Sequence, residues 1–157
     1  MNRFVHFIKS VSSLTRDKFI QVPVSASKHL SNSSYESMEL AEIVRKLNTF
    51  APTSMAGSWD NVGLLVEPTP PHQVSKVLLT NDLTEDVMTE AIDMKANMIL
   101  SYHPPIFSAL KRLTQRTWKE RIVIKCIENR IAVYSPHTAF DALNGGVNDW
   151  MLKPFGE

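Results

Sequence analysis

The spacing of hydrophobic positions changes from helical to strand-like several times after residue 37. Apolar residues recur every three or four positions from Leu40 to Phe50, which predicts a helix with one buried face and Ser37 as its N-cap. Similar spacing predicts further helices at residues 84–95 and 117–129, and a last helix that contains Val147, Trp150 and Met151 and stops at Pro154. Short apolar runs bounded by turn residues predict strands at residues 62–66, 77–80, 98–101 and 131–134.

Strands that alternate with helices in this way indicate an α/β layered fold, with a mostly parallel sheet and flanking helices. Thr84 and Thr117 stand at the N-cap positions of their helices, and Thr117 with Glu120 fits a capping box. Prolines between residues 68 and 72 predict a loop that exposes His72.

The first 37 residues differ in composition from the rest of the chain. They are rich in serine, hold five basic residues against two acidic ones, and place Phe4, Phe7 and Val11 at helical spacing. Such a segment is typical of a mitochondrial transit peptide, and a disordered extension without a targeting role is the alternative. We therefore predict an extension over residues 1–37 and a folded domain over residues 38–157.

The composition excludes several classes of protein. A chain of 157 residues with 43% hydrophobic content is long enough for one ordinary globular domain. Its formal net charge of +1 provides no global basic field, which argues against direct nucleic-acid binding. No apolar run approaches the ~20 residues that a membrane span needs. The single Cys126 allows neither a disulfide framework nor a cysteine metal site, and we expect it to be buried.

Residues with metal-binding side chains follow three of the predicted strands. Asp82, His103 and His137 each come shortly after a strand, and Asp141 lies four residues beyond His137. Because ligands of such folds collect at the carboxyl ends of the strands, we expect these side chains to converge. Imidazole and carboxylate together suit a divalent ion such as zinc, iron or manganese.

Each candidate also has a structural interpretation. A histidine at a strand end can cap an edge or hydrogen-bond the core, and Asp82 can form an Asx turn or orient a ligand imidazole, which we rank above direct coordination. The basic residues between 111 and 130 are typical of a solvated helix face. Alternatively, Lys111 and Arg112 form a rim that attracts an anionic substrate. Neither a P-loop nor a serine or cysteine nucleophile motif is present in the sequence.

Four segments, SWDNVGLLVE, TNDLT, SYHPPIF and SPHTAFDALNGGVNDW, closely resemble in order and spacing the amino-terminal half of the NIF-three-like family, also known as GTP cyclohydrolase I type 2-like proteins. The tyrosine of SYHPPIF is similar to that of the animal branch. The resemblance covers about residues 38–157. It implies an α/β fold, a two-metal centre, oligomers built as rings of dimers, and a metal-dependent hydrolase activity. By position, His103, His137 and Asp141 match metal ligands, while Asp82 and Tyr102 line the site.

The chain departs from the family pattern at two points. Tyr102 stands where family members often have a histidine, and a neutral phenol coordinates metal poorly. The family also supplies a further histidine and glutamate from a carboxy-terminal His-x-x-x-Glu segment, whereas this sequence ends at Glu157. We therefore expect a truncated form, incomplete relative to the family fold, that holds divalent metal weakly if at all and not as a pair.

The resemblance implies two functions. Animal members are described as transcriptional co-regulator partners in cytoplasm and nucleus, with a mitochondrial association as well. For this chain we prefer an interaction protein that retains part of a di-metal site without turnover. The alternative is a metal-dependent hydrolase, active in the full-length form on a small nucleotide-like substrate. Protein partners are expected in either case, and homo-oligomers in the full-length family.

Overall fold

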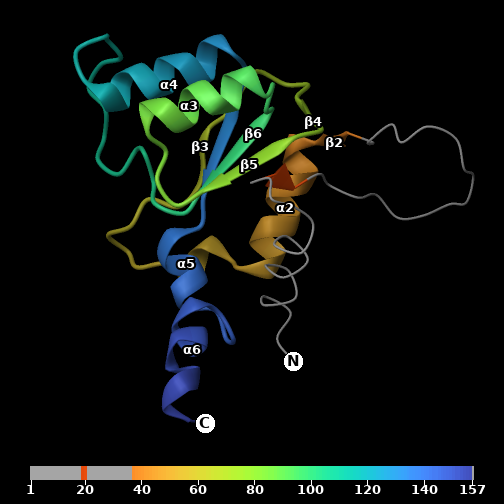
Figure 1. Cartoon of the computed structure of the whole chain (residues 1–157), viewed down its shortest axis with the longest axis vertical. Coiled ribbons are helices and arrows are strands. Elements are labelled where there is room, and N and C mark those ends of the chain that lie inside the picture. The colour runs from red at the N-terminus through yellow and green to blue at the C-terminus, as the bar shows by residue number, and fades with distance from the viewer. Residues whose placement is uncertain (1–18, 21–36, 157) are drawn as a thin grey trace, which may run out of the picture.

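The computed structural model describes residues 19–20 and 37–156, which form a five-stranded sheet with helices on both faces (Figure 1). The strands lie in the order β1, β5, β6, β7, β3, and their bounds are Phe19–Ile20, Val77–Thr80, Met98–Ser101, Ala132–Ser135 and Gly63–Val66. β5, β6 and β7 run parallel, while the outer strands β1 and β3 pair antiparallel with their neighbours. The predicted α/β class with a mostly parallel sheet is confirmed, since its central strands are parallel.

The predicted helices are present close to their expected positions, and a short helix at His137–Asp141 is present in addition. Their bounds are Leu40–Phe50 for α2, Glu85–Asp93 for α3, Trp118–Glu128 for α4, His137–Asp141 for α5 and Val147–Leu152 for α6. α3 and α4 lie side by side over one face of the sheet, whereas α2 lies on the other (Figure 1). Short 3-10 helices follow α2 at Thr53–Met55 and α6 at Lys153–Phe155.

Alternate residues of the central strands pack into two hydrophobic cores, one on each face of the sheet. On β6, Ile99 packs with residues of α3 and α4, whereas Met98 packs on the opposite side with residues of α2. Leu78 and Val77 divide in the same way on β5. Successive side chains of a strand point to opposite faces, so a sheet covered on both faces needs the continuous apolar runs that these strands show.

The predicted N-caps at Thr84 and Thr117 are confirmed, whereas the predicted capping box needs a correction. Thr84 accepts a hydrogen bond from the backbone N–H of Val87, and Thr117 accepts one from that of Glu120, as N-caps do. The capping box is only half formed, because the carboxylate of Glu120 accepts from the backbone and hydroxyl of Thr114 instead.

The predicted N-cap of the first helix is wrong. α2 begins at Leu40, and Ser37 instead donates its hydroxyl to Oε1 of Gln73 at 3.1 Å. The physical reason is a two-stranded sheet, in which β2 (Met38–Glu39) pairs with β4 (Gln73–Val74). Residues directly before the helix are therefore extended and paired, so Ser37 lies too far from the first helical turn to cap it.

His72 is not the exposed loop residue that the prolines predict. Only 6% of its surface is accessible, and its Nε2 lies 2.9 Å from the carbonyl oxygen of Asn97. Its own carbonyl accepts from the backbone N–H of Leu40, which fixes the end of the loop where β4 begins. The burial predicted for Cys126 is confirmed.

Most of the predicted extension over residues 1–37 lies outside the described residues. Within it, Phe19 and Ile20 form β1 against β5 at one edge of the sheet. Among the helices of the described part of the chain, none has the length and apolar character that crossing a membrane requires.

Candidate metal site at the strand ends

Asp60 and His137 form a buried hydrogen bond at the carboxyl end of β7. Nδ1 of His137 lies 2.8 Å from Oδ1 of Asp60, whose side chain is 1% exposed. Because an ionised carboxylate can only accept, the histidine carries its proton on Nδ1. Nε2 of the ring is then left with a free lone pair, which is the form that binds a metal ion.

The antiparallel direction of β3 brings Asp60 to this edge. Gly63 of β3 pairs with Ser135 of β7, so residues that precede β3 lie beside residues that follow β7. The sequence pattern did not predict Asp60 as a site residue, because in a purely parallel sheet only the residues that follow a strand reach this edge. The signal was present in the segment SWDNVGLLVE, where an aspartate stands three residues before a strand.

Thr138 holds the other oxygen of the same carboxylate. Its hydroxyl and its backbone N–H both donate to Oδ2 of Asp60, at 2.5 and 3.2 Å. Burial alone raises the pKa of Asp60, but the hydrogen bonds from Thr138, His137 and Asn61 together outweigh burial and lower that pKa below its ordinary value. Asp60 therefore stays ionised at neutral pH and anchors the first turn of α5.

His103 and Asp82 repeat the arrangement in a more exposed position. Nδ1 of His103 lies 2.9 Å from Oδ1 of Asp82, with the two side chains 51% and 68% exposed. In this contact the carboxylate of Asp82 meets the nitrogen that a metal ion bound at Nε2 would leave free, which is the position that its predicted orienting role requires. Carboxylates that hold a ligand imidazole in this manner are common around protein metal ions.

The two imidazoles are neighbours in an edge-to-face arrangement at the strand ends. Their ring centroids are 5.7 Å apart with an interplanar angle of 74°. Two imidazoles bound through Nε2 to one tetrahedral ion have centroids about 5 Å apart, given metal–nitrogen bonds of ~2 Å. The separation and the chemistry of His103 and His137 therefore fit a shared divalent ion.

Asp141, the third predicted ligand, is hydrogen-bonded to Tyr102. Oδ1 of Asp141 accepts a hydrogen bond from the hydroxyl of Tyr102. Burial raises the pKa of Tyr102, and the carboxylate of Asp141 raises it further. Within residues 37–156 no group of three histidine, cysteine or acidic side chains is close enough to hold a metal ion. The described residues thus supply two neighbouring imidazoles and a carboxylate held by Tyr102.

The backbone at His137 has an unusual conformation. Its φ angle is +32°, on the left-handed side that residues other than glycine seldom adopt. The other non-glycine residues with positive φ in the described part of the chain, Lys95 and Arg130, follow the ends of α3 and α4. Strain of this kind persists where surrounding contacts impose it, here the hydrogen bonds of the His137 ring and of Thr138 to Asp60.

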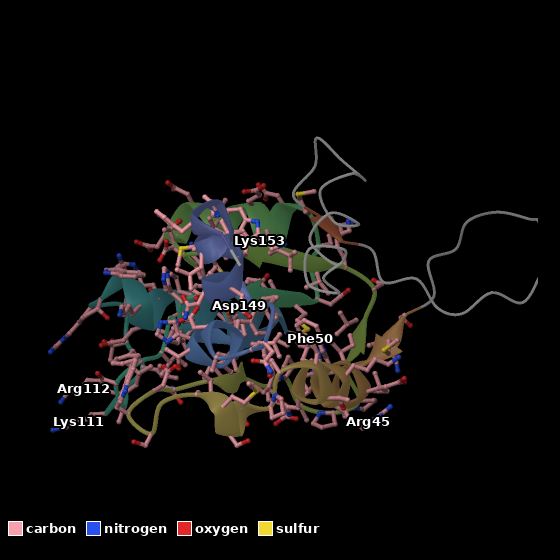
Figure 2. All side chains as sticks on the ribbon, turned by 90° about the horizontal axis from the view of Figure 1, so that it is seen from below. Arg45, Phe50, Lys111, Arg112, Asp149 and Lys153 are labelled. Carbon is pink, nitrogen blue, oxygen red and sulfur yellow. The ribbon has the colours of Figure 1, made fainter. Side chains whose placement is uncertain are left out.

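Exposed aromatic rings border the histidine pair. The rings of Trp59 and Phe107 lie 6.2 Å from one another, and each lies 6.4 Å from the ring of His137 at 87° to it. Lys111 and Arg112, the predicted basic rim for an anionic substrate, extend from the outer edge of the molecule (Figure 2). The structure therefore borders the site with aromatic side chains.

Comparison with known proteins places these features in a family. Residues 38–156 match the family described as Duf34/NIF3 (NGG1p interacting factor 3). NIF3-like protein 1 of Homo sapiens is 59% identical over 125 residues, which are 80% of this chain and 33% of that protein. NGG1-interacting factor 3 of Saccharomyces cerevisiae is 43% identical over 124 residues, 73% of this chain and 43% of that protein.

Solved structures show the same fold. The Bacillus cereus protein related to NIF3 has a TM-score of 0.68 and 36% identity, covering 76% of this chain and 32% of that one. Reduced HcgD from Methanocaldococcus jannaschii has a TM-score of 0.69 and 26% identity, covering 75% of this chain and 47% of that one. The chain spans about a third of the length of the mammalian relatives that it matches.

Proposed function

Because the chain belongs to the Duf34/NIF3 family, we propose that His103 and His137, with their aspartate partners, form one wall of a divalent-metal site. The observation that carries this proposal is the pair of neighbouring imidazoles, each hydrogen-bonded at Nδ1 to a carboxylate. Zinc, iron and manganese all accept such nitrogen ligands. Two nitrogen donors alone bind weakly, so we expect modest affinity in this chain.

The residues divide into ligands and residues that orient them. His103 and His137 provide the donor nitrogens, whereas Asp82 and Asp60 fix the tautomer and the direction of each ring. Asp141 is the carboxylate nearest in the chain to His137 that can complete the set, once its contact with Tyr102 is broken. The chemistry that a bound ion supplies is activation of water for hydrolysis. We assign that hydrolysis to longer family members, whose further ligands complete the site.

Metal titration of the 157-residue chain tests the proposal. Isothermal titration with Co²⁺ and Zn²⁺ should detect binding to the wild type and its loss in His137→Ala and in His103→Ala. His72→Gln is the matched control, because His72 is buried beside Asn97, at the opposite end of β6 from His103. Absence of binding to the wild type, or binding by both alanine variants that equals that of the wild type, would rule out the metal site.

A second function is suggested by the name of the yeast relative and by the surface of α6. NGG1-interacting factor 3 is named for a protein partner. In this chain Trp150, Met151, Leu152 and Phe155 are all more than half exposed, and α6 extends away from the sheet (Figure 1). Exposed apolar side chains gathered in one segment are typical of protein interaction sites. We infer that the chain binds a counterpart of the yeast NGG1 partner through this segment.

Affinity capture with that counterpart separates the two functions. Trp150→Ala together with Phe155→Ala should weaken capture, whereas His137→Ala should leave it unchanged. Trp118→Ala is the matched control, because Trp118 is also exposed but lies at the start of α4. Equal capture by the wild type and the α6 double variant would refute the interaction surface.

A further inference from the structure

The side chain of Tyr102 lies beside both histidines and is hydrogen-bonded to Asp141, the carboxylate that could bind the same metal ion. Its ring centroid lies 5.1 Å from that of His103 and 5.9 Å from that of His137. Its hydroxyl donates to Oδ1 of Asp141. One side chain therefore contacts all three of the residues that the family resemblance matches to metal ligands.

The backbone of Asp141 has little freedom to move toward the histidines. α5 is fixed at its start by the two hydrogen bonds from Thr138 to Asp60 and near its end by Phe140, which packs edge-on against Phe50 at 5.8 Å. Asp141 can therefore approach an ion at the histidine pair only by turning its side chain. That rotation breaks the hydrogen bond to Tyr102.

A donated hydrogen bond and a metal ion compete for the same carboxylate. A hydrogen bond to an ionised group is stronger than one between neutral groups. The metal–oxygen bond that replaces it must therefore first offset the free energy lost when that hydrogen bond breaks. A neutral phenol offers no comparable metal ligand in exchange. The contact of Tyr102 with Asp141 should thus lower the affinity of the whole site for divalent cations.

We propose that the hydroxyl of Tyr102 competes with divalent metal for Asp141, so that Asp141 adds to the metal affinity of the histidine pair only when this hydrogen bond is exchanged. The proposal rests on the metal site proposed above. It goes beyond that site because Tyr102 is assigned a role that weakens metal binding, and because the affinity for divalent metal then depends on one hydroxyl group.

Removing the hydroxyl tests this role directly. Tyr102→Phe keeps the ring beside both histidines and should bind Co²⁺ about tenfold more tightly than the wild type, the order expected for one charged hydrogen bond that no longer has to be broken. Tyr134→Phe is the matched control, since it removes a hydroxyl that donates to Asn48 at 2.8 Å, away from the site. Its affinity for Co²⁺ should equal that of the wild type.

A second pair of variants tests whether the effect passes through Asp141. In an Asp141→Ala background, Tyr102→Phe should no longer change the affinity for Co²⁺, because the group for which both compete is absent. Thermal unfolding in the presence of a chelator checks that each variant is folded. The increase in unfolding temperature on addition of Co²⁺ gives a second measure of binding beside the calorimetry.

The possible outcomes distinguish the two proposals. Binding of Co²⁺ by the wild type with unchanged or weaker binding by Tyr102→Phe overturns the competition and leaves the metal site intact, with weaker binding indicating that the phenol is itself a ligand. Failure of both proteins to bind Co²⁺ overturns the metal site and the competition together. Tighter binding that persists in the Asp141→Ala background also refutes the role of Asp141.

Discussion

Asp60 and His137 are 77 residues apart in the sequence, yet Oδ1 of the aspartate lies 2.8 Å from Nδ1 of the histidine. The contact fixes which nitrogen of the ring carries the proton and, with the bonds from Thr138, where α5 begins. Asp60 thus has two roles, one in the candidate metal site and one in stability. Mutations of this residue should reveal both.

Loss of the Asp60 carboxylate should weaken metal binding. Asp60→Asn leaves the ring of His137 without its ionised partner, and removal of such an orienting carboxylate typically lowers metal affinity by about 10–100-fold. Titration of the variant with Co²⁺ measures the effect. Asp82→Asn is the comparison: we expect a smaller loss there, because the exposed pair of His103 and Asp82 is less constrained. A larger loss for Asp82→Asn would contradict this order.

Asp60 should also make the folded state sensitive to acid. Its folded pKa lies below the ordinary value of 3.8, so its stabilisation is complete above the unfolded pKa and is lost as pH falls through the folded pKa. At pH 6 we expect Asp60→Asn to be destabilised by about 1–3 kcal/mol, and this difference to shrink below about pH 4. Urea unfolding of both proteins from pH 3 to pH 6 measures it. A difference that is constant over this range would exclude linkage through Asp60.

Trp59 should report metal binding by its fluorescence. Its ring lies 6.4 Å from that of His137, so a paramagnetic ion such as Co²⁺ bound at Nε2 of the histidine lies close enough to quench its emission. The quenching should follow the calorimetric binding curve and disappear in His137→Ala. Trp59→Phe should remove most of the metal-dependent change, leaving the emission of Trp118 and Trp150. Quenching that is unaltered in this variant would place the ion elsewhere.

Relief of backbone strain at the end of α3 should stabilise the fold. Lys95 has φ +56°, and the backbone N–H groups of Lys95 and Ala96 donate to the carbonyls of Ile92 and Ala91, which is a Schellman ending. Glycine adopts this conformation without steric cost, so Lys95→Gly should raise the free energy of unfolding by about 0.5–1 kcal/mol.

Chemical denaturation of Lys95→Gly and Lys95→Ala isolates this effect from the loss of the lysine side chain. The alanine variant retains the strain and should be no more stable than the wild type. If the two variants had equal stability, strain at this position would not be the cause.

Local patterns in the sequence were sufficient to predict the longer strands and helices of this protein, but not the short elements β1, β2, β4 and α5. The apolar runs at residues 77–80 and 98–101 become β5 and β6, and Thr84 caps α3, because these features depend on neighbours within a few positions. Local patterns also placed His103 and Asp82 at adjacent strand ends, where parallel strands necessarily bring them together. The family segments in the sequence identified the same edge.

Tertiary structure alone decided which residues complete the site. The direction of β3 is a property of its pairing with β7, so no local pattern could bring Asp60 to His137. In the same way, Asp141 lies four residues from His137 on one helix, yet it bonds to Tyr102 because β6 ends beside α5. Sequence spacing limits which side chains can meet, whereas strand direction and the competition among hydrogen-bond partners determine which of them do.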